Sequence, residues 1–452
     1  MIEYYLNELI RKDGEVTSKM LHDLITDNQA NRAHLEELFE RYKATEAGVP
    51  VLTRTFTDVT KINNKINNDF FGDIIDIKVG YFAGEPISYK IDDERAANVL
   101  DNFKLVNHIP DVDAETVKMM AICGYGARLC YIDREGQERI MNVDPWEVIF
   151  ITDMTINEPQ YAMRYYRVKV QAGDHSEEVW RVEWYDDEMV TYYIERSGQF
   201  VLDNTEAVNP KPHLFEGVPL IGFPNNEELM GDCEKVLNLI DGYDNTLSDV
   251  NSEVEQFRLA YLAFYGYDPD PETMEKAQRT GAFGLDIEGK IEFITKDLND
   301  QIIENHLDRL ENNIYKFSQT PNFSDEAFAG SQSGEARKYK MLPFENKCAT
   351  TERKMTKSLM EMFKILSTAW AKKGIAVEWK DIEMTFTRNF PLDLLHEAEV
   401  QAKLKGLVSD MKRLSLFSAV EDPAAELEAM DAERPVDLDQ FGGDEDEPVE
   451  ES

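Results

Sequence analysis

Basic residues are scarce in this chain. Its 452 residues include 48 Lys and Arg against 88 Asp and Glu, which gives a formal net charge of −40 at pH 7. A protein that grips nucleic acid needs Lys and Arg over the contact surface, because binding neutralises phosphates. The composition therefore argues against such a protein and favours a soluble surface on which like charges repel.

Long apolar runs and cysteines are also rare. The sequence contains no run of about 18 apolar residues, the length needed to span a bilayer, so we expect no membrane partner. The first residues, MIEYYLNELIRKDGEV, are acidic from the start and have no apolar core, which argues against a signal peptide. The four cysteines form no CxxC pair, so we expect buried thiols in a reducing compartment. They are Cys123, Cys130, Cys233 and Cys348.

Motifs of known chemistry are missing. The chain has no GxxxxGK[ST] loop, its seven histidines show no HxxxH or HxH spacing, and GYG at 124–126 is only a fragment of a dinucleotide fingerprint. GSQSG at 330–334 has the spacing of a nucleophile elbow but lacks the strand that must precede one. We therefore predict no catalytic site, no metal and no cofactor. Carboxylates are so abundant that a nuclease-like cluster stays open as an alternative.

The residues that are present predict an α+β chain that is mainly α. Apolar residues at helical spacing indicate helices up to about residue 123, and residues 124–202 carry the β-branched and aromatic alternation of an antiparallel sheet. One hairpin is expected around residues 134–136. The length allows two to four domains.

A long heptad pattern begins at Leu229. Its apolar positions are separated by steps of four and three residues, which is typical of a coiled coil or a packed long helix. They are Leu229, Cys233, Val236, Ile240, Tyr243, Leu247, Val250, Val254, Phe257 and Tyr261. A helix over 227–262 would form a rod of roughly 54 Å. Seven acidic residues on its other faces are expected to be solvated or to line a channel.

A small insertion separates this pattern from a second one. Pro269 and Pro271 break the helix, and IEFIT reads as a short strand. The second heptad runs over Ile303, Leu307, Leu310, Ile314 and Phe317. Two long helices that flank an insertion predict an αα-hairpin with a small unit at its tip.

The segment PNFSDEAFAGSQSGEARKYK (321–340) follows, and its glycines and serines predict a loose loop. A third long helix, to about residue 373, should kink at Pro343. DIEMTFT reads as a strand, and two further helices are expected before an acidic, apolar-poor tail from Pro435.

Four stretches in order resemble the portal proteins of tailed bacteriophages, in particular the long-tailed branch that infects Gram-positive bacteria. They are NNKINNDFFGDIIDIKVGYFAGEPISY (63–89), VPLIGFPNNEELMGDCEKVLNLIDGYDNTLSDVNSEVEQF (218–257), YKMLPFENKCATTERKM (339–355) and FTRNFPLDLLHEAEVQAKLKG (386–406). Together they cover most of the chain from about residue 60 to 430.

The resemblance implies a ring, typically of about twelve copies, built from one repeated interface. The expected parts are a wing (1–226), a first stem helix (227–263), an α/β clip (264–297), a second stem helix (298–320), a tunnel loop (321–335), a kinked helix that returns to the wing (336–392), a helical crown (393–434) and an acidic disordered tail (435–452). Double-stranded DNA would pass through the channel without sequence recognition. The implied protein partners are the terminase large subunit, a head–tail adaptor, and capsid and scaffolding proteins, in the virion and earlier in the host cytoplasm.

We expect the tunnel loop and the start of the kinked helix to carry the DNA contacts. The candidates are Phe323, Asp325, Glu326, Phe328, Gln332, Arg337, Lys338 and Lys340. An alternative for the cations is a salt bridge to a neighbouring subunit's acidic stem. The stem seam is expected at Val236, Ile240, Tyr243, Leu247, Val250, Val254 and Phe257. Two other functions stay open, namely an acidic coiled-coil scaffold or adaptor without a channel, and a carboxylate-based hydrolase or nuclease.

Overall fold

The computed structural model divides the chain into two compact units, and each is described by itself. Unit 1 is Met1–Asp325 with Lys340–Asn389, and unit 2 is Glu326–Tyr339 with Phe390–Ser452. The structure describes residues 16–57, 61–152, 161–172, 175–257, 261–265, 270–280, 290–294, 300–323, 334–389, 394–417, 419–420 and 423–433.

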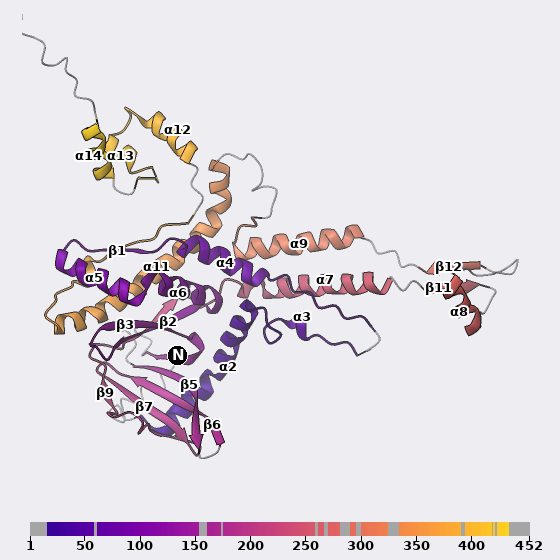
Figure 1. The fold of residues 1–452 in the computed structure, drawn as a ribbon, viewed down its shortest axis with the longest axis horizontal. Helices are drawn as coiled ribbons and strands as arrows, with labels where there is room; N and C mark the ends of the chain where they lie inside the picture. The colour runs from indigo at the N-terminus through magenta and orange to yellow at the C-terminus, as the bar shows by residue number, and fades with distance from the viewer. Residues whose placement is uncertain are drawn as a thin grey trace, which may run out of the picture. The chain divides into compact units, whose positions relative to one another are not determined.

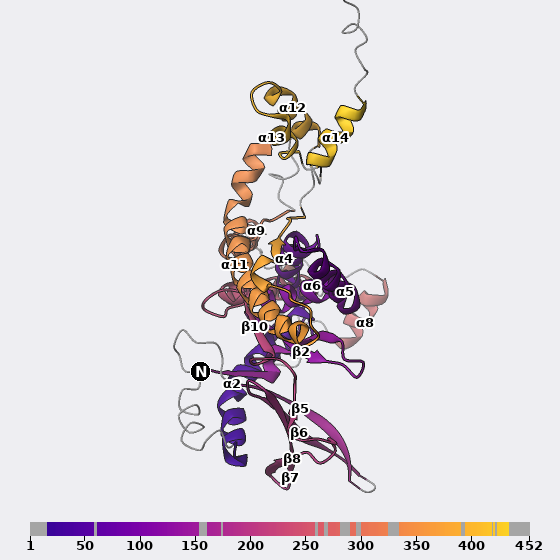
Figure 2. The ribbon, with the colours of Figure 1, turned by 90° about the vertical axis from the view of Figure 1, so that its left-hand side faces the viewer.

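The first described helix of unit 1 is α2 (Ser18–Tyr42). Thr17 caps its N-terminus by accepting a hydrogen bond from the backbone N of Met20 at 3.3 Å. Met20, Leu21 and Leu24 face an antiparallel sheet, which α2 follows along one side (Figure 2). Farther along, α2 turns Leu35 and Leu38 into a second cluster, so this single helix joins two cores.

The sheet beside α2 has the strand order β4-β5-β6-β7-β8, and β9 also pairs with β7. Its strands are β4 (Val148–Ile151), β5 (Tyr161–Ala172), β6 (His175–Tyr185), β7 (Met189–Arg196), β8 (Gln199–Leu202) and β9 (Lys211–Pro212). β5 and β6 pair along their whole lengths, but β4 and β7 cover only the part of the hairpin nearer the core. The distal part of the β5–β6 hairpin is therefore a two-stranded ribbon.

A smaller sheet has the order β10-β2-β3, from Leu220–Pro224, Tyr125–Ile132 and Glu138–Val143. The turn between β2 and β3 lies at residues 133–137 with Gly136 at φ 78°, which confirms the predicted hairpin. The remaining elements up to residue 226 are α3 (Pro50–Thr53), α4 (Phe70–Ala83), β1 (Ser88–Lys90), α5 (Glu94–Asn107), α6 (Ile109–Cys123) and the 3-10 turn η1 (Pro145–Glu147). α4 continues through Gly80 and ends before Gly84, its C-cap residue.

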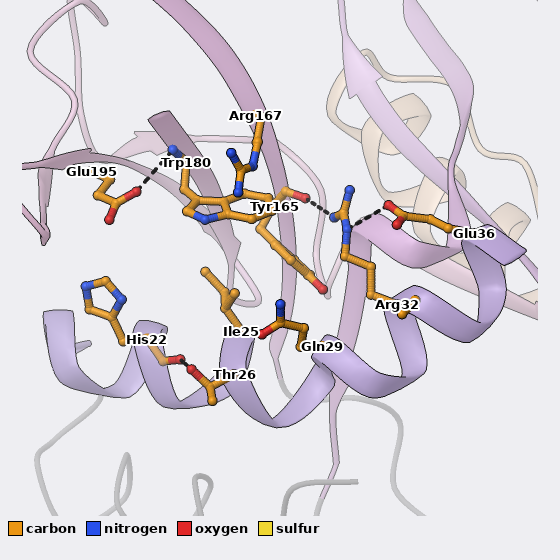
Figure 3. Close-up of a pocket in the computed structure, with 11 residues that line it drawn as sticks. His22, Ile25, Thr26, Gln29, Arg32, Glu36, Tyr165, Arg167, Trp180 and Glu195 are labelled. Carbon is orange, nitrogen blue, oxygen red and sulfur yellow. Dashed lines mark hydrogen bonds and ion pairs between the residues drawn. The ribbon is translucent and has the colours of Figure 1, made fainter. Parts of the chain in front are cut away.

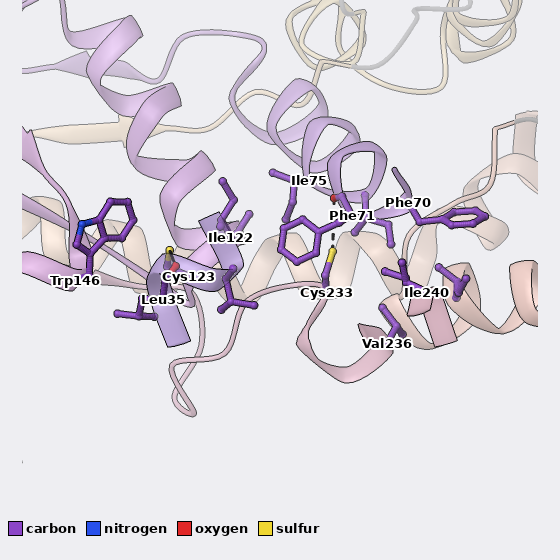
Figure 4. Close-up of a cluster of buried hydrophobic side chains, with 14 residues drawn as sticks. Leu35, Phe70, Phe71, Ile75, Ile122, Cys123, Trp146, Cys233, Val236 and Ile240 are labelled. Atoms are coloured by element: carbon purple, nitrogen blue, oxygen red, sulfur yellow. Dashed lines mark hydrogen bonds between the residues drawn. The ribbon is translucent and has the colours of Figure 1, made fainter. Parts of the chain in front are cut away.

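A central hydrophobic cluster joins these elements (Figure 4). Its buried members include Phe70, Phe71 and Ile75 of α4, and Ile122 of α6. Val236 and Ile240, from the beginning of the heptad pattern, complete the same cluster. The first turns of the heptad segment are thus buried in a core that they share with α2, α4 and α6.

The stem hairpin consists of α7 (Leu237–Phe257), preceded by the 3-10 turn η2 (Glu234–Val236), and α9 (Asp300–Ser318), which lie side by side (Figure 1). Between them come β11 (Tyr261–Tyr265), α8 (Pro271–Thr280) and β12 (Lys290–Ile294). β11 and β12 form a two-stranded antiparallel sheet. The predicted helix over 227–262 was too long at both ends, because residues 227–233 precede the helix and Tyr261 already lies in a strand.

After the stem come α11 (Gly334–Lys372), the turn η3 (Trp379–Asp381) and β13 (Glu383–Thr385), which pairs with β1. Pro343 lies inside α11 as predicted, whereas the kink stays a prediction. Unit 2 holds the helices α12 (Leu394–Leu404), α13 (Asp410–Leu414) and α14 (Pro423–Glu433). These elements confirm the α+β, mainly α, fold class. The predicted acidic tail lies outside the described residues.

Candidate functional site at the base of the stem

A segment without regular secondary structure, residues 61–68, runs along α7, and we call it the strap. Asn68 donates from its backbone N and its Nδ2 to Asp244 Oδ1, at 3.1 and 2.8 Å. The backbone N of Ile66 donates to Ser248 Oγ at 2.9 Å. The backbone N of Asn64 donates to Ser252 Oγ, also at 2.9 Å.

The spacing of these contacts follows from backbone geometry. Two extended residues advance about 6.6 Å, and four helical residues advance about 6.0 Å. Every second strap residue therefore meets every fourth residue of α7. Asp244, Ser248 and Ser252 are buried, so each satisfies a backbone N–H that would otherwise be shielded from water without a partner.

The acidic residues of this part of the chain are engaged within the subunit. Arg41 donates to Asp241 at 2.8 Å, and Arg54 donates to Asp249 at 2.8 Å. Asn64 Nδ2 donates to Glu255 Oε2 at 2.9 Å, and Glu253 also has an interaction partner. Asp241, Asp244, Asp249 and Glu255 of α7 are thus bonded to Arg41, Arg54 or the strap, while Asp249 and Glu255 also stay exposed, in line with the expectation of solvated faces.

The predicted seam residues divide into three groups. Val236 and Ile240 are buried in the wing cluster, whereas Tyr243, Leu247 and Val250 are half-buried. Val254 is 51% exposed, and nothing is described of the side chain of Phe257. On α9, Leu307 and Ile314 are buried, but Ile302 is 65% exposed and Phe317 is 54% exposed. Apolar cover within one subunit is therefore incomplete both toward the tip of the hairpin, at Val254 and Ile302, and near the end of α9, at Phe317.

A buried polar cluster lies where the stem joins the wing, and we call it the base cluster. It consists of Lys78 (α4), Asn225 and Asp232 (between β10 and η2), and Lys347 and Thr351 (α11). Lys78 Nζ is 2.7 Å from Asn225 Oδ1, 3.0 Å from Thr351 Oγ1 and 2.9 Å from Asp232 Oδ2. An ammonium group has three protons, and three acceptors surround this one.

The charges of the base cluster support one another. Burial lowers the pKa of Lys78, although the Asp232 carboxylate opposes this effect. Burial alone would raise the pKa of Asp232, but the ammonium groups of Lys347 and Lys78, helped by hydrogen bonds, hold it below its ordinary value. Asp232 therefore stays ionised between two cations.

Lys347 also holds the end of α9. Its Nζ donates to the backbone O of Ser318 at 2.8 Å and lies 3.3 Å from Asp232 Oδ1. α9 ends with Gln319 at φ 59°, and the backbone N of Thr320 donates to Tyr315 O at 3.1 Å. This pattern of a left-handed residue with a back-donated bond closes a helix. One cation thus joins α9 and α11, the two helices that flank the predicted tunnel loop.

Most predicted DNA contacts cannot be placed. Asp325, Glu326, Phe328 and Gln332 lie outside the described residues. Arg337 and Lys338 belong to α11, but their side chains are not described. Phe323 is 49% exposed and Lys340 is exposed, and each has an interaction partner.

Sequence reasoning missed both the strap contacts and the base cluster. The alternation in NNKINN and the four-residue spacing of Asp244, Ser248 and Ser252 were visible signals, but neither suggests that the two segments meet. No signal in the sequence marked Lys78 as buried. Among the described residues, no group of His, Cys, Asp or Glu could hold a metal ion, and no helix is long and apolar enough to cross a membrane.

Comparison with known proteins places this arrangement in a family. The model of the family "Phage portal protein, SPP1 Gp6-like" matches residues 21–436. The portal protein of Bacillus phage SPP1 is 26% identical over 461 aligned residues, which cover 95% of this chain and 89% of that protein. The portal protein of Clostridium phage phiCD119 is 22% identical over 386 aligned residues, which cover 80% of this chain and 83% of that protein.

The family match includes the strap, the stem hairpin and the base cluster, since all of them lie within residues 21–436. The two relatives come from phages of Gram-positive hosts, in agreement with the resemblance seen in the sequence. This chain therefore belongs to the SPP1 Gp6-like family of phage portal proteins.

Proposed function

We propose that this portal subunit forms a closed ring at one vertex of a phage head, and that double-stranded DNA enters and leaves through its channel. The observation that carries the proposal is the incomplete apolar cover of the stem hairpin. Val254, Ile302 and Phe317 are each more than half exposed in one subunit. A heterologous interface repeated around a ring would cover such positions with the next copy.

The proposed division of the chain follows the family. Residues 1–226 form the wing, 227–263 and 298–320 the stem, 264–297 the clip, 321–335 the tunnel loop, 336–392 the kinked helix with its return to the wing, and 393–434 the crown. In this arrangement the clip meets the terminase large subunit and later the head–tail adaptor. The other partners are capsid and scaffolding proteins, first in the host cytoplasm and then in the virion.

The ring need not hold DNA tightly. Strong phosphate contacts would retain the duplex at one register, and a chain with a net charge of −40 disfavours them. Because wing and strap residues hold the carboxylates of α7, we place the DNA contacts mainly at the tunnel loop and the start of α11. The residues proposed for them are Phe323, Asp325, Glu326, Phe328, Gln332, Arg337, Lys338 and Lys340.

The tunnel loop gives the direct test. Residues 325–331 are deleted, or Lys338 and Lys340 are changed to Glu, and head assembly and DNA packaging are measured separately. Normal heads with impaired packaging support a working loop. Heads that package full-length genomes as well as wild type would show that the loop takes no part.

Two alternatives give different results. A coiled-coil scaffold or adaptor would appear as extended rods in negative-stain microscopy, whereas a portal forms rings of about twelve copies with a central hole. A carboxylate-based nuclease would cleave duplex DNA with a divalent metal. We expect rings and no cleavage.

A further inference from the structure

The chain reverses its direction at the end of α9. Gln319 has a φ of 59°, and the backbone N of Thr320 donates to Tyr315 O at 3.1 Å. Farther on, Asn322 Nδ2 donates to Glu311 Oε1 at 2.8 Å. Glu311 lies about two turns before the end of α9, so the chain runs back along the helix as it enters the proposed tunnel loop.

The core holds the body of α9 but leaves its last turn less covered. Ile314 is buried in the central hydrophobic cluster, and the Tyr315 hydroxyl donates to Asp73 Oδ2 of α4 at 2.8 Å. Phe317, in contrast, is 54% exposed. A cavity of about 240 Å³ lies between the last residues of α9 and the base cluster. Polar contacts across this space therefore matter for the position of the reversal.

Lys347 makes such a contact. Its Nζ donates to Ser318 O at 2.8 Å and lies 3.3 Å from Asp232 Oδ1, with both side chains largely shielded from solvent. Asp232 is itself held firmly, since it pairs with Lys78 of α4 and its backbone N donates to Ala121 O of α6 at 2.7 Å. A cation at the carbonyl end of a helix also interacts favourably with the helix dipole.

We propose that Lys347 is a positioning residue of the tunnel loop, which holds the reversal at Gln319 and thereby sets where residues 321–335 leave the end of α9. This inference rests on the proposed channel. A ring of loops has a defined width only if every copy places its loop at the same radius. Lys347 acts through Ser318 O and does not need to touch DNA.

Hydrogen exchange in the full-length protein tests the placement. In Lys347→Met, the amides of Gln319 and Thr320 should exchange about tenfold faster, because a hydrogen bond from a charged donor is lost beside them. Exchange at Ile314, which the core holds, should stay as in wild type. Lys347→Arg should restore the protection, since a guanidinium can donate to both the carbonyl and the carboxylate and the cavity gives it room.

Arg32→Met is the matched control. Arg32 also pairs with a carboxylate, Glu36 at 2.9 Å, and donates to a backbone carbonyl, Tyr165 O at 3.5 Å. It also borders a cavity, the groove of about 530 Å³ between α2 and the sheet face of β5 and β6 (Figure 3). The substitution changes the net charge equally, but it should leave exchange at Gln319 and Thr320 unaltered.

Packaging provides the functional measurement. Heads made with Lys347→Met should form in normal number, fewer of them should contain full-length genomes, and Lys347→Arg should recover packaging. If the methionine variant does not assemble, Lys347→Gln, which removes the charge but keeps a donor, is measured in the same way.

Two results would overturn the inference. One is wild-type exchange at Gln319 and Thr320 in the neutral variants, and the other is faster exchange there with normal packaging. Deletion of 325–331 separates this inference from the proposed function. Normal packaging after the deletion would refute a working loop, whereas impaired packaging after the deletion but not in Lys347→Met would refute only the role of Lys347.

Discussion

Lys78 Nζ lies 2.9 Å from Asp232 Oδ2, and neither side chain exposes more than 1% of its surface. The two residues are far apart in sequence, one on a wing helix and the other just before the stem. Their pairing joins α4 to the segment that leads into η2 and α7, and separating the two charges would leave each buried without its partner.

Lys78→Met should destabilise the protein strongly. Removing one partner of a buried ion pair costs about 3–5 kcal/mol, although Lys347 still faces Asp232 and should offset part of the loss. Urea unfolding at pH 7 measures the change. Lys90→Met, at an exposed site on β1, serves as the control, and equal stability of the two variants would contradict the role of the pair.

Replacing the Asp244 carboxylate with an amide should not destabilise the protein. Burial raises the pKa of its carboxyl above the ordinary value, with smaller contributions from Asp241 and Asp69. Asp244→Asn removes the charge and keeps an oxygen for Asn68, so we expect it to match or exceed wild-type stability at pH 7. Asp244→Ala leaves the Asn68 N–H without this acceptor and should cost about 1–3 kcal/mol.

The same group predicts a dependence on pH. Because the folded pKa lies above the unfolded one, wild type binds more protons when folded and gains stability as pH falls through the folded pKa. The advantage of Asp244→Asn should therefore be full above the folded pKa and vanish below the ordinary carboxyl value of 3.8. An advantage that grows on acidification would refute this assignment. Unfolding curves at a series of pH values follow the difference.

Ser248→Ala should loosen the strap. Ile66 loses the acceptor for its backbone N–H, so its amide and those of Asn64 and Asn68 should exchange faster with deuterium. Thr246→Ala on the same helix is the matched control, since its hydroxyl bonds only to Gly242 O in the described contacts. Similar exchange in the two variants would mean that the serine does not hold the strap.

Two glycines should respond in opposite ways to alanine. A Cβ at Gly231 would lie 2.2 Å from Ile122 O, so Gly231→Ala must displace backbone and should lower the melting temperature clearly. A Cβ at Gly242 in α7 meets nothing within 4 Å, so Gly242→Ala should stabilise the subunit by up to about 1 kcal/mol. Thermal melts of both variants provide the measurement. If both substitutions shift the melting temperature in the same direction, the described packing is contradicted.

The four cysteine thiols should be unreactive toward thiol reagents in the native protein. All are buried, and burial raises the pKa of Cys130 to about 12 and that of Cys348 to about 11. Since the thiolate is the reactive form, a thiol reagent at pH 8 should label almost none of them until denaturant is added. Rapid native labelling at Cys348 would show that α11 opens.

The sequence was most informative where apolar spacing decides the structure. The stem pair, the β2–β3 hairpin and the strand over IEFIT were all predictable, because burial on one face imposes a period. The start of α7 could not be predicted in this way. Leu229 and Cys233 continue the apolar spacing, but Leu229 has φ 55°, a left-handed conformation outside the helix. β11 was missed because the YLAFY run fits a buried helix as well as a strand.

Polar contacts between segments that are distant in the sequence could not be predicted from the sequence. A lysine such as Lys78 is usually exposed, and its burial is tolerable because Asn225 and Asp232, from the segment before η2, and Thr351 of α11 all accept from it. The acidic residues of α7 show the same limit. Their carboxylates were recognised as a feature, but Arg41 and Arg54, which donate to Asp241 and Asp249, lie 200 and 195 residues earlier in the sequence.

The strap and α7 pair through two repeats of slightly different length, two residues of the strap and four residues of the helix. Each step of the strap exceeds the matching step of the helix by about 0.6 Å, so the mismatch reaches roughly 2 Å after three steps. A hydrogen bond does not survive that error, which limits the length of such a ladder. Beyond Asn68 the chain enters the apolar core, where Phe70 and Ile240 belong to the same cluster. Inserting one residue in the strap would turn its next N–H away from the helix, so natural length variation in this segment should come in pairs.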